Sequence, residues 1–153
     1  MTALEIDAFF KAYAGAFSRL AVDEICNKWA YPAYFVANGR RASLTEDAFR
    51  VNTEALCRFY QARGVALAEK QVLEISRLAA STVSVRTADT LSSADGGKIA
   101  AWEHVYLVSD TENGPRVVTA MADAELAAWR ALERDEKKWI PVFRPHPAPT
   151  KET

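Results

Sequence analysis

The sequence predicts a single α+β domain in which amphipathic helices come first and an antiparallel sheet follows. Apolar residues recur every three to four positions at the start of the chain and again before residue 63. From about residue 65 the period changes to two, over at least four consecutive segments. The 153 residues, half of them apolar, are enough to bury one core. Helices followed by a run of strands are typical of the α+β class.

Two helices and a small hairpin are expected at the start of the chain. An apolar stripe predicts a helix over residues 3–20. Asp23 can cap a shorter helix that runs through Trp29. A hairpin over residues 33–44 follows, because Asn38-Gly39 at its centre is a strong signal for a two-residue turn.

A third helix is expected to end at about Arg63. The stretch Ser43 to Glu46 has the form of a capping box, and Thr45 is an equally good N-cap residue. Gly64 fits the position that follows the end of a helix.

At least four strands and a helix are expected after residue 65. Alternating side chains predict strands over residues 70–79 and 82–91. The segment 95–123 forms a hairpin whose turn lies within residues 109–115. Residues with high helix propensity follow from Asp123.

The chain is expected to form one domain over residues 1–140, with a Pro-rich tail over residues 141–153. No apolar run approaches the roughly 18 residues of a membrane span, and the N-terminus has no secretory pattern. We therefore expect no membrane contact and a cytoplasmic location. The net charge of -1 provides no basic surface for nucleic acid.

Neither a metal nor a cofactor is expected. Cys26 and Cys57 lie in helical apolar patterns, which indicates buried free thiols. With these cysteines and two distant histidines, His104 and His146, the sequence has no metal-ligand spacing. Gly96-Gly97 does not match a dinucleotide or phosphate-binding motif.

Four features in residues 3–123 point to a family. They are the helix F-F-K-A-Y-A-G-A-F-S-R-L with the following D-E-I-C-N-K-W-A, the hairpin with Gly39, the helix start S-L-T-E-D-A-F, and the closing D-G-G-K-I-A-A-W-E-H-V-Y-L-V…G-P-R-V-V. This arrangement resembles the nuclear-transport-factor-2-like superfamily, in particular its polyketide-cyclase-like (SnoaL-like) branch.

The resemblance implies a cone-shaped fold, in which a curved antiparallel sheet wraps around the N-terminal helices and the deep end forms a pocket. It also implies a homodimer joined through the sheet. The superfamily includes isomerases, dehydratases, epoxide hydrolases, cyclases and non-catalytic proteins, so the fold by itself does not identify the function.

Tyr13 occupies the position in the first helix where the ketosteroid isomerases of this superfamily have an oxyanion-binding tyrosine. The resemblance therefore implies a hydroxyl at the pocket floor, and the alternative is a core aromatic residue with a hydrogen-bonded hydroxyl. These isomerases also need a carboxylate base just after the second helix. The matching stretch, residues 34–39, contains no Asp or Glu, so steroid-isomerase chemistry is not expected.

His104 shares one face of its strand with two aromatic residues. If this face lines the pocket, His104 is a candidate general acid or base, since dehydratases of the superfamily use pocket histidines. The alternative is a structural histidine, because alternation does not show which face is the pocket. Glu103 lies on the opposite face, where it can pair with Arg77 or Arg86. Asp123 can cap a helix or orient His104.

Two functions remain open from the sequence. The first is a pocket for a small hydrophobic compound, acting as a cofactor-free lyase or isomerase if it is catalytic. The second is a non-catalytic dimeric binding or assembly module whose aromatic side chains fill the cone. An open cavity of roughly several hundred Å3 would favour the first. The catalytic candidates are His104 and Tyr13. The other residues expected to line the pocket are Phe17, Trp29, Phe59, Trp102 and Tyr106.

Overall fold

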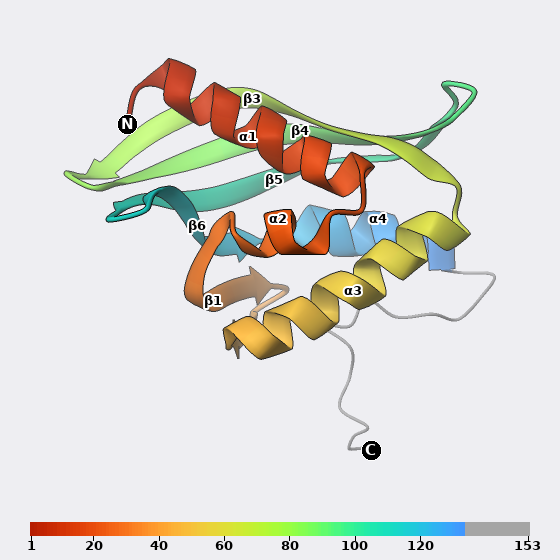
Figure 1. The fold of residues 1–153 in the computed structure, drawn as a ribbon, viewed down its shortest axis with the longest axis horizontal. Helices are drawn as coiled ribbons and strands as arrows, with labels where there is room; N and C mark the ends of the chain where they lie inside the picture. The colour runs from red at the N-terminus through yellow and green to blue at the C-terminus, as the bar shows by residue number, and fades with distance from the viewer. Residues whose placement is uncertain (134–153) are drawn as a thin grey trace.

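The computed structural model describes residues 1–133, so the predicted domain end at residue 140 and the tail over residues 141–153 lie outside the described part (Figure 1). The elements are α1 (Ala3–Ser18), α2 (Val22–Cys26), β1 (Trp29–Ala37), β2 (Arg40–Leu44), α3 (Glu46–Ala62), β3 (Val65–Ala79), β4 (Thr82–Ser93), β5 (Lys98–Thr111), β6 (Gly114–Met121) and α4 (Asp123–Glu133). The predicted α+β class is confirmed.

The six strands form one curved sheet in the order β2-β1-β6-β5-β4-β3. Neighbouring strands run antiparallel, except that β1 lies parallel to β6. The sheet is therefore mixed, and the prediction of a wholly antiparallel sheet is wrong at this pair. The pairing joins Trp29–Ala37 to Gly114–Met121, which lie far apart along the chain, and local alternation contains no information on the direction of such a distant neighbour.

The helices pack on the concave side of this sheet (Figure 1). Helix α1 lies along β3, α2 contacts α3, and α4 packs against β5. Burial along β5 shows which face of the sheet they cover. His104, Tyr106 and Val108 are buried, whereas Glu103 is exposed. The strand face that carries His104 is thus the concave one, which the alternation pattern left open.

The second helix is shorter than the sequence predicts. Its N-cap is Ala21, which makes no side-chain cap, and Asp23 lies in the first turn. Trp29 belongs to β1, where it pairs with Val117 of β6. The long-range pairing with the last strand extends the backbone at Trp29, and it overrides the local helical pattern.

The third helix is capped by Thr45, whose hydroxyl accepts a hydrogen bond of 3.2 Å from the backbone N–H of Ala48. The predicted end near Arg63 is confirmed, since Arg63 is the C-cap residue. Strand β3 begins at Val65, earlier than the predicted residue 70. Three register shifts interrupt β3, so strict alternation holds only over parts of it.

Cys26 and Cys57 are both free and buried, as predicted. The predicted helix after Asp123 is also confirmed as α4. The carboxylate of Asp123 does not orient His104. This carboxylate instead accepts a hydrogen bond of 3.0 Å from the backbone N–H of Asn38, which connects α4 to the turn between β1 and β2. Within residues 1–133, no helix is long and apolar enough to cross a membrane.

Phe10 provides a test of this core. Its side chain is fully buried, and its ring lies 5.1 Å from the ring of Tyr106 across the interface between α1 and β5. We expect Phe10→Ala to lower the free energy of unfolding by about 3–5 kcal/mol, because it leaves a cavity that the sheet cannot close. Urea denaturation measures this loss. Leu4→Ala is the matched control, since Leu4 is 83% exposed on the same helix. Equal effects of the two substitutions would contradict the proposed packing.

Candidate functional site

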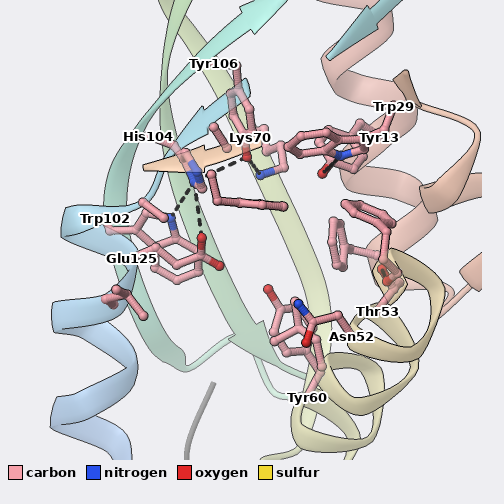
Figure 2. Close-up of a pocket in the computed structure, with 17 residues that line it drawn as sticks. Tyr13, Trp29, Asn52, Thr53, Tyr60, Lys70, Trp102, His104, Tyr106 and Glu125 are labelled. Carbon is pink, nitrogen blue, oxygen red and sulfur yellow. Dashed lines mark hydrogen bonds and ion pairs between the residues drawn. The ribbon is translucent and has the colours of Figure 1, made fainter. Parts of the chain in front are cut away.

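The concave side of the sheet encloses a cavity between α1, α3 and α4 (Figure 2). Its volume is about 80 Å3, which is room for several waters or a small compound. Six of the expected site residues line it: Tyr13, Phe17, Trp29, Trp102, His104 and Tyr106.

Phe59 is not among the lining residues. Its ring packs against Trp129 with the centroids 4.8 Å apart, and the next residue, Tyr60, lines the cavity instead. Both residues belong to the apolar stripe of α3. Only the placement of α3 against α4 determines which of the two rings faces the cavity.

A buried ion pair lies in the wall of the cavity. Lys70 of β3 and Asp89 of β4 are cross-strand partners, and their side chains are 8% and 3% exposed. The Lys70 ammonium donates hydrogen bonds to Asp89 Oδ2 at 2.5 Å and to the Tyr106 hydroxyl at 2.6 Å. Thr87 donates to the second oxygen of Asp89 at 2.5 Å. Both carboxylate oxygens are therefore partnered, as a buried charge requires.

Aromatic rings surround the Lys70 ammonium. Its Nζ lies 5.1 Å from the ring centroid of Tyr13, 5.8 Å from that of Phe17 and 5.0 Å from that of Tyr106. These are favourable distances for a cation over an aromatic face. Neither Lys70 nor Asp89 was identified from the sequence. The sequence did contain a signal for them. In the alternating pattern of the two strands, both residues fall at positions whose side chains face the core, where a charged residue needs a buried partner.

His104 is 4% exposed and lies at the centre of this cluster. Its Nδ1 lies 3.3 Å from both the indole nitrogen of Trp102 and the hydroxyl oxygen of Tyr106. Its Nε2 is buried and has no hydrogen-bond partner within the described residues. Burial first, and then the positive charge of Lys70, lower the pKa of His104 to about 3 against the opposing effect of Asp89. The imidazole is neutral at pH 7.

Glu125 of α4 brings a carboxyl group to the same nitrogen. Its Oε1 lies 3.6 Å from Nδ1 of His104, and its Oε2 accepts a hydrogen bond of 3.0 Å from the indole N–H of Trp129. Burial raises the pKa of Glu125, although the hydrogen bond from Trp129 and the charge of Lys70 oppose the shift. Sequence reasoning missed this residue. The i,i+4 spacing of Glu125 and Trp129, beside the buried Leu126, was the available signal.

The Tyr13 hydroxyl accepts a hydrogen bond of 2.8 Å from the indole N–H of Trp29. Burial, as the largest cause, raises the pKa of Tyr13 far above its usual range, so the phenol keeps its proton. Among the hydrogen bonds within residues 1–133, none has the Tyr13 hydroxyl as donor. Tyr13 thus lines the cavity, has a partner for its oxygen, and has a proton that it can donate to a ligand.

Glu103 lies on the outer face of the sheet, where its carboxylate is 2.9 Å from Arg86, one of its two expected partners. Within residues 1–133, no group of three His, Cys, Asp or Glu side chains is placed to hold a metal ion.

The low pKa of His104 predicts that the free energy of unfolding falls as the pH is lowered. Between pH 6.5 and pH 3 the unfolded chain binds a proton at His104 that the folded protein excludes, so acidification destabilises the fold by up to about 1.4 kcal/mol per pH unit. His104→Asn lacks this group. Urea denaturation at pH 7, 5.5 and 4 should therefore show the stability advantage of the wild type over His104→Asn shrinking as the pH falls. A difference that stays constant over this range would contradict a neutral buried imidazole.

A family model described as "NTF2-like protein (DUF6841)" matches residues 4–125. No curated protein matches the chain. Among solved structures, an NTF-2 like protein of unknown function from Shewanella oneidensis MR-1 has a TM-score of 0.64 and 14% identity, with 79% of this chain and 98% of that chain covered. An NTF2-like protein with a cystatin-like fold from Novosphingobium aromaticivorans has a TM-score of 0.60 and 17% identity, with coverages of 84% and 86%.

A ketosteroid isomerase-like protein from Erwinia carotovora atroseptica has a TM-score of 0.53 and 20% identity, with 77% of this chain and 92% of that chain covered. At these identities the structural likeness shows the fold alone. The match to the family model confirms the superfamily that the sequence suggested, without distinguishing its SnoaL-like branch. Because that match spans most of the chain, this protein belongs to the NTF2-like family DUF6841.

Proposed function

We propose that the cavity binds a small, largely apolar compound and transfers a proton on it, as a cofactor-free lyase or isomerase. The observation that carries the proposal is the meeting of His104 and Glu125 at 3.6 Å in an aromatic cavity, beside a buried Lys70. Titratable groups with shifted pKa values in a cavity are typical of acid–base sites.

The polar groups approach the cavity from different walls (Figure 2). Lys70 and Tyr13 provide a positive charge and a hydroxyl proton, which suit an oxygen that gains negative charge during a reaction. Glu125 enters from α4, and its raised pKa is closer to neutrality than that of an exposed carboxyl, as general acid–base catalysis favours. The carboxyl group absent from residues 34–39 thus has a counterpart on α4.

The alternative is a non-catalytic module with a filled cone. Two observations disfavour it. A purely structural core gains little from an ion pair, because apolar side chains of equal volume stabilise as much or more. The cavity also touches both His104 and Tyr13. Its volume of about 80 Å3 is smaller than the several hundred Å3 that would favour a ligand pocket, so the polar groups and not the volume carry the choice between the two functions. Sites for drug-sized ligands have roughly 300–1,000 Å3, so a compound with about one ring is the best fit.

A thermal-shift screen of single-ring hydrophobic compounds tests the binding, and NMR detection of isomerised or dehydrated product tests the reaction. We expect Glu125→Gln to lower turnover by about 100-fold or more, since it removes the transferable proton and keeps the side-chain shape. Glu103→Gln is the control, because Glu103 lies on the outer face. Full turnover in Glu125→Gln would contradict the proposed role.

His104→Ala and Tyr13→Phe should lower turnover as well. Tyr13→Phe also leaves the Trp29 N–H without its acceptor, which costs about 1–3 kcal/mol of stability. Its activity is therefore compared at a temperature well below the unfolding midpoint of the variant.

We also propose that the protein forms a homodimer through the outer face of the sheet. Val36, Met121 and Val105 lie in register across β1, β6 and β5 on that face, and Tyr34 beside them is 48% exposed. Adjacent apolar side chains at the centre of an exposed sheet face are typical of an interface between subunits.

Light scattering should give a mass near twice the 16.9 kDa of one chain. We expect Met121→Glu to shift the protein to the monomer, because it places a charge in the apolar row. Met121 is 37% exposed, so the substitution should leave the fold intact. Leu4→Glu, on an exposed position of α1, is the control. A wild-type mass near 16.9 kDa would contradict the dimer.

A further inference from the structure

Trp102 determines which nitrogen of His104 carries the proton. The indole nitrogen of a tryptophan can donate a hydrogen bond through its N–H but cannot accept one. In Trp102 this nitrogen lies 3.3 Å from Nδ1 of His104, so Nδ1 must offer a lone pair. In a neutral imidazole the proton is then on Nε2. The Tyr106 hydroxyl oxygen lies at the same distance from Nδ1 and accepts a hydrogen bond from Lys70, while the single lone pair of Nδ1 accepts from Trp102. The proton on Nε2 has no acceptor within residues 1–133, so this N–H is open to a ligand.

The surrounding charges constrain Glu125. Its Oε1 lies 3.6 Å from Nδ1 of His104, and Oδ2 of Asp89 lies 3.9 Å from the same nitrogen. An ionised Glu125 would add a second negative charge beside Asp89, whose charge the Lys70 ammonium already balances, whereas a protonated Glu125 avoids this repulsion. The other oxygen, Oε2, already accepts the N–H of Trp129, which leaves Oε1 as the oxygen that carries the proton.

The charged groups around the cavity then cancel. Lys70 of β3 and Asp89 of β4 form a pair of opposite charges. His104 of β5 is neutral, as Trp102 requires. Tyr13 of α1, Tyr60 of α3 and Tyr106 of β5 are buried phenols with raised pKa values, the first cause in each case being burial. A cavity of zero net charge disfavours a charged occupant, because desolvating an unpaired ion costs several kcal/mol.

We propose that the cavity selects an uncharged compound with a hydroxyl group on a small apolar body, and that Glu125 meets this compound as an acid. The inference rests on the proposed function and extends it to a substrate class. It also favours a lyase over an isomerase, because the resting site holds a proton to donate and no ionised base beside the ligand.

The corresponding reaction is a dehydration. Glu125 gives its proton to the hydroxyl oxygen, and the electrons of the C–O bond leave with the water that forms. The electrons of a C–H bond on the neighbouring carbon make the double bond, and the proton from that carbon returns to the Glu125 carboxylate. The enzyme ends in its starting state.

Three compounds with the same ring and different charge test the selection: benzyl alcohol, benzoate and benzylamine, which is a cation at pH 7. Calorimetry and thermal shift on the full chain should show benzyl alcohol binding at least tenfold more tightly than either ion. Tightest binding of benzylamine, lost in Glu125→Gln, would overturn the proposal and show an ionised Glu125. Tightest binding of benzoate, lost in Lys70→Met, would overturn it in favour of an anion site.

The outcomes of this experiment distinguish a failure of the proposed function from a failure of the substrate class alone. If none of the three compounds binds, the cavity does not take a single-ring ligand, and both proposals fall. If an ion binds best, the pocket stands and only the substrate class is wrong.

The proton on His104 can be read without any ligand. The chain has two histidines, so a spectrum of His104→Asn assigns the 15N signals of His104 by difference. At pH 7 we expect a protonated Nε2 and an unprotonated Nδ1, with a mixture of the two tautomers in Trp102→Phe. A protonated Nδ1 in the wild type would overturn the argument, because the Trp102 N–H could not then donate to it.

Discussion

The buried pair of Lys70 and Asp89 constrains the whole concave face of this fold. A charge in a space that excludes water must be partnered, and the partners must themselves be satisfied. Thr87, Tyr106 and the surrounding rings meet that requirement for the pair. Lys70 and Asp89 are cross-strand partners on β3 and β4, and the adjacent β5 supplies Tyr106, so the polar cluster depends on the pairing of these three strands.

Helix α4 completes the site that the sheet begins. Without it, the cluster would contain an ion pair and a neutral imidazole but no second carboxyl. Trp129 is fully buried, with its ring 5.4 Å from Trp102 and 5.2 Å from Tyr60, and this packing places Glu125 one helical turn away against His104. A packing interaction of the last described helix thus determines the acid–base chemistry that the first helices and the sheet can support.

Much of the fold could be predicted because it depends on local periodicity. The stripe of α1, the cap at Thr45 and the alternation along β4 and β5 are each contained in a few neighbouring residues. The errors have one origin, a contact between distant segments. Trp29 belongs to β1 and not to the predicted helix, because it pairs with Val117 of β6. The parallel direction of β1 is determined by its pairing with the same strand.

The candidate site divides in the same way. The sequence by itself determined the superfamily, the elements, and most of the aromatic residues that line the cavity, since apolar side chains at fixed periods must face a core. Only the tertiary structure decided that His104 lies on the concave face, and that Lys70, Asp89 and Glu125 meet it there. The physical reason is that hydrogen bonds and ion pairs act over a few ångströms in space, between residues that lie far apart along the chain, 36 positions for Lys70 and Tyr106.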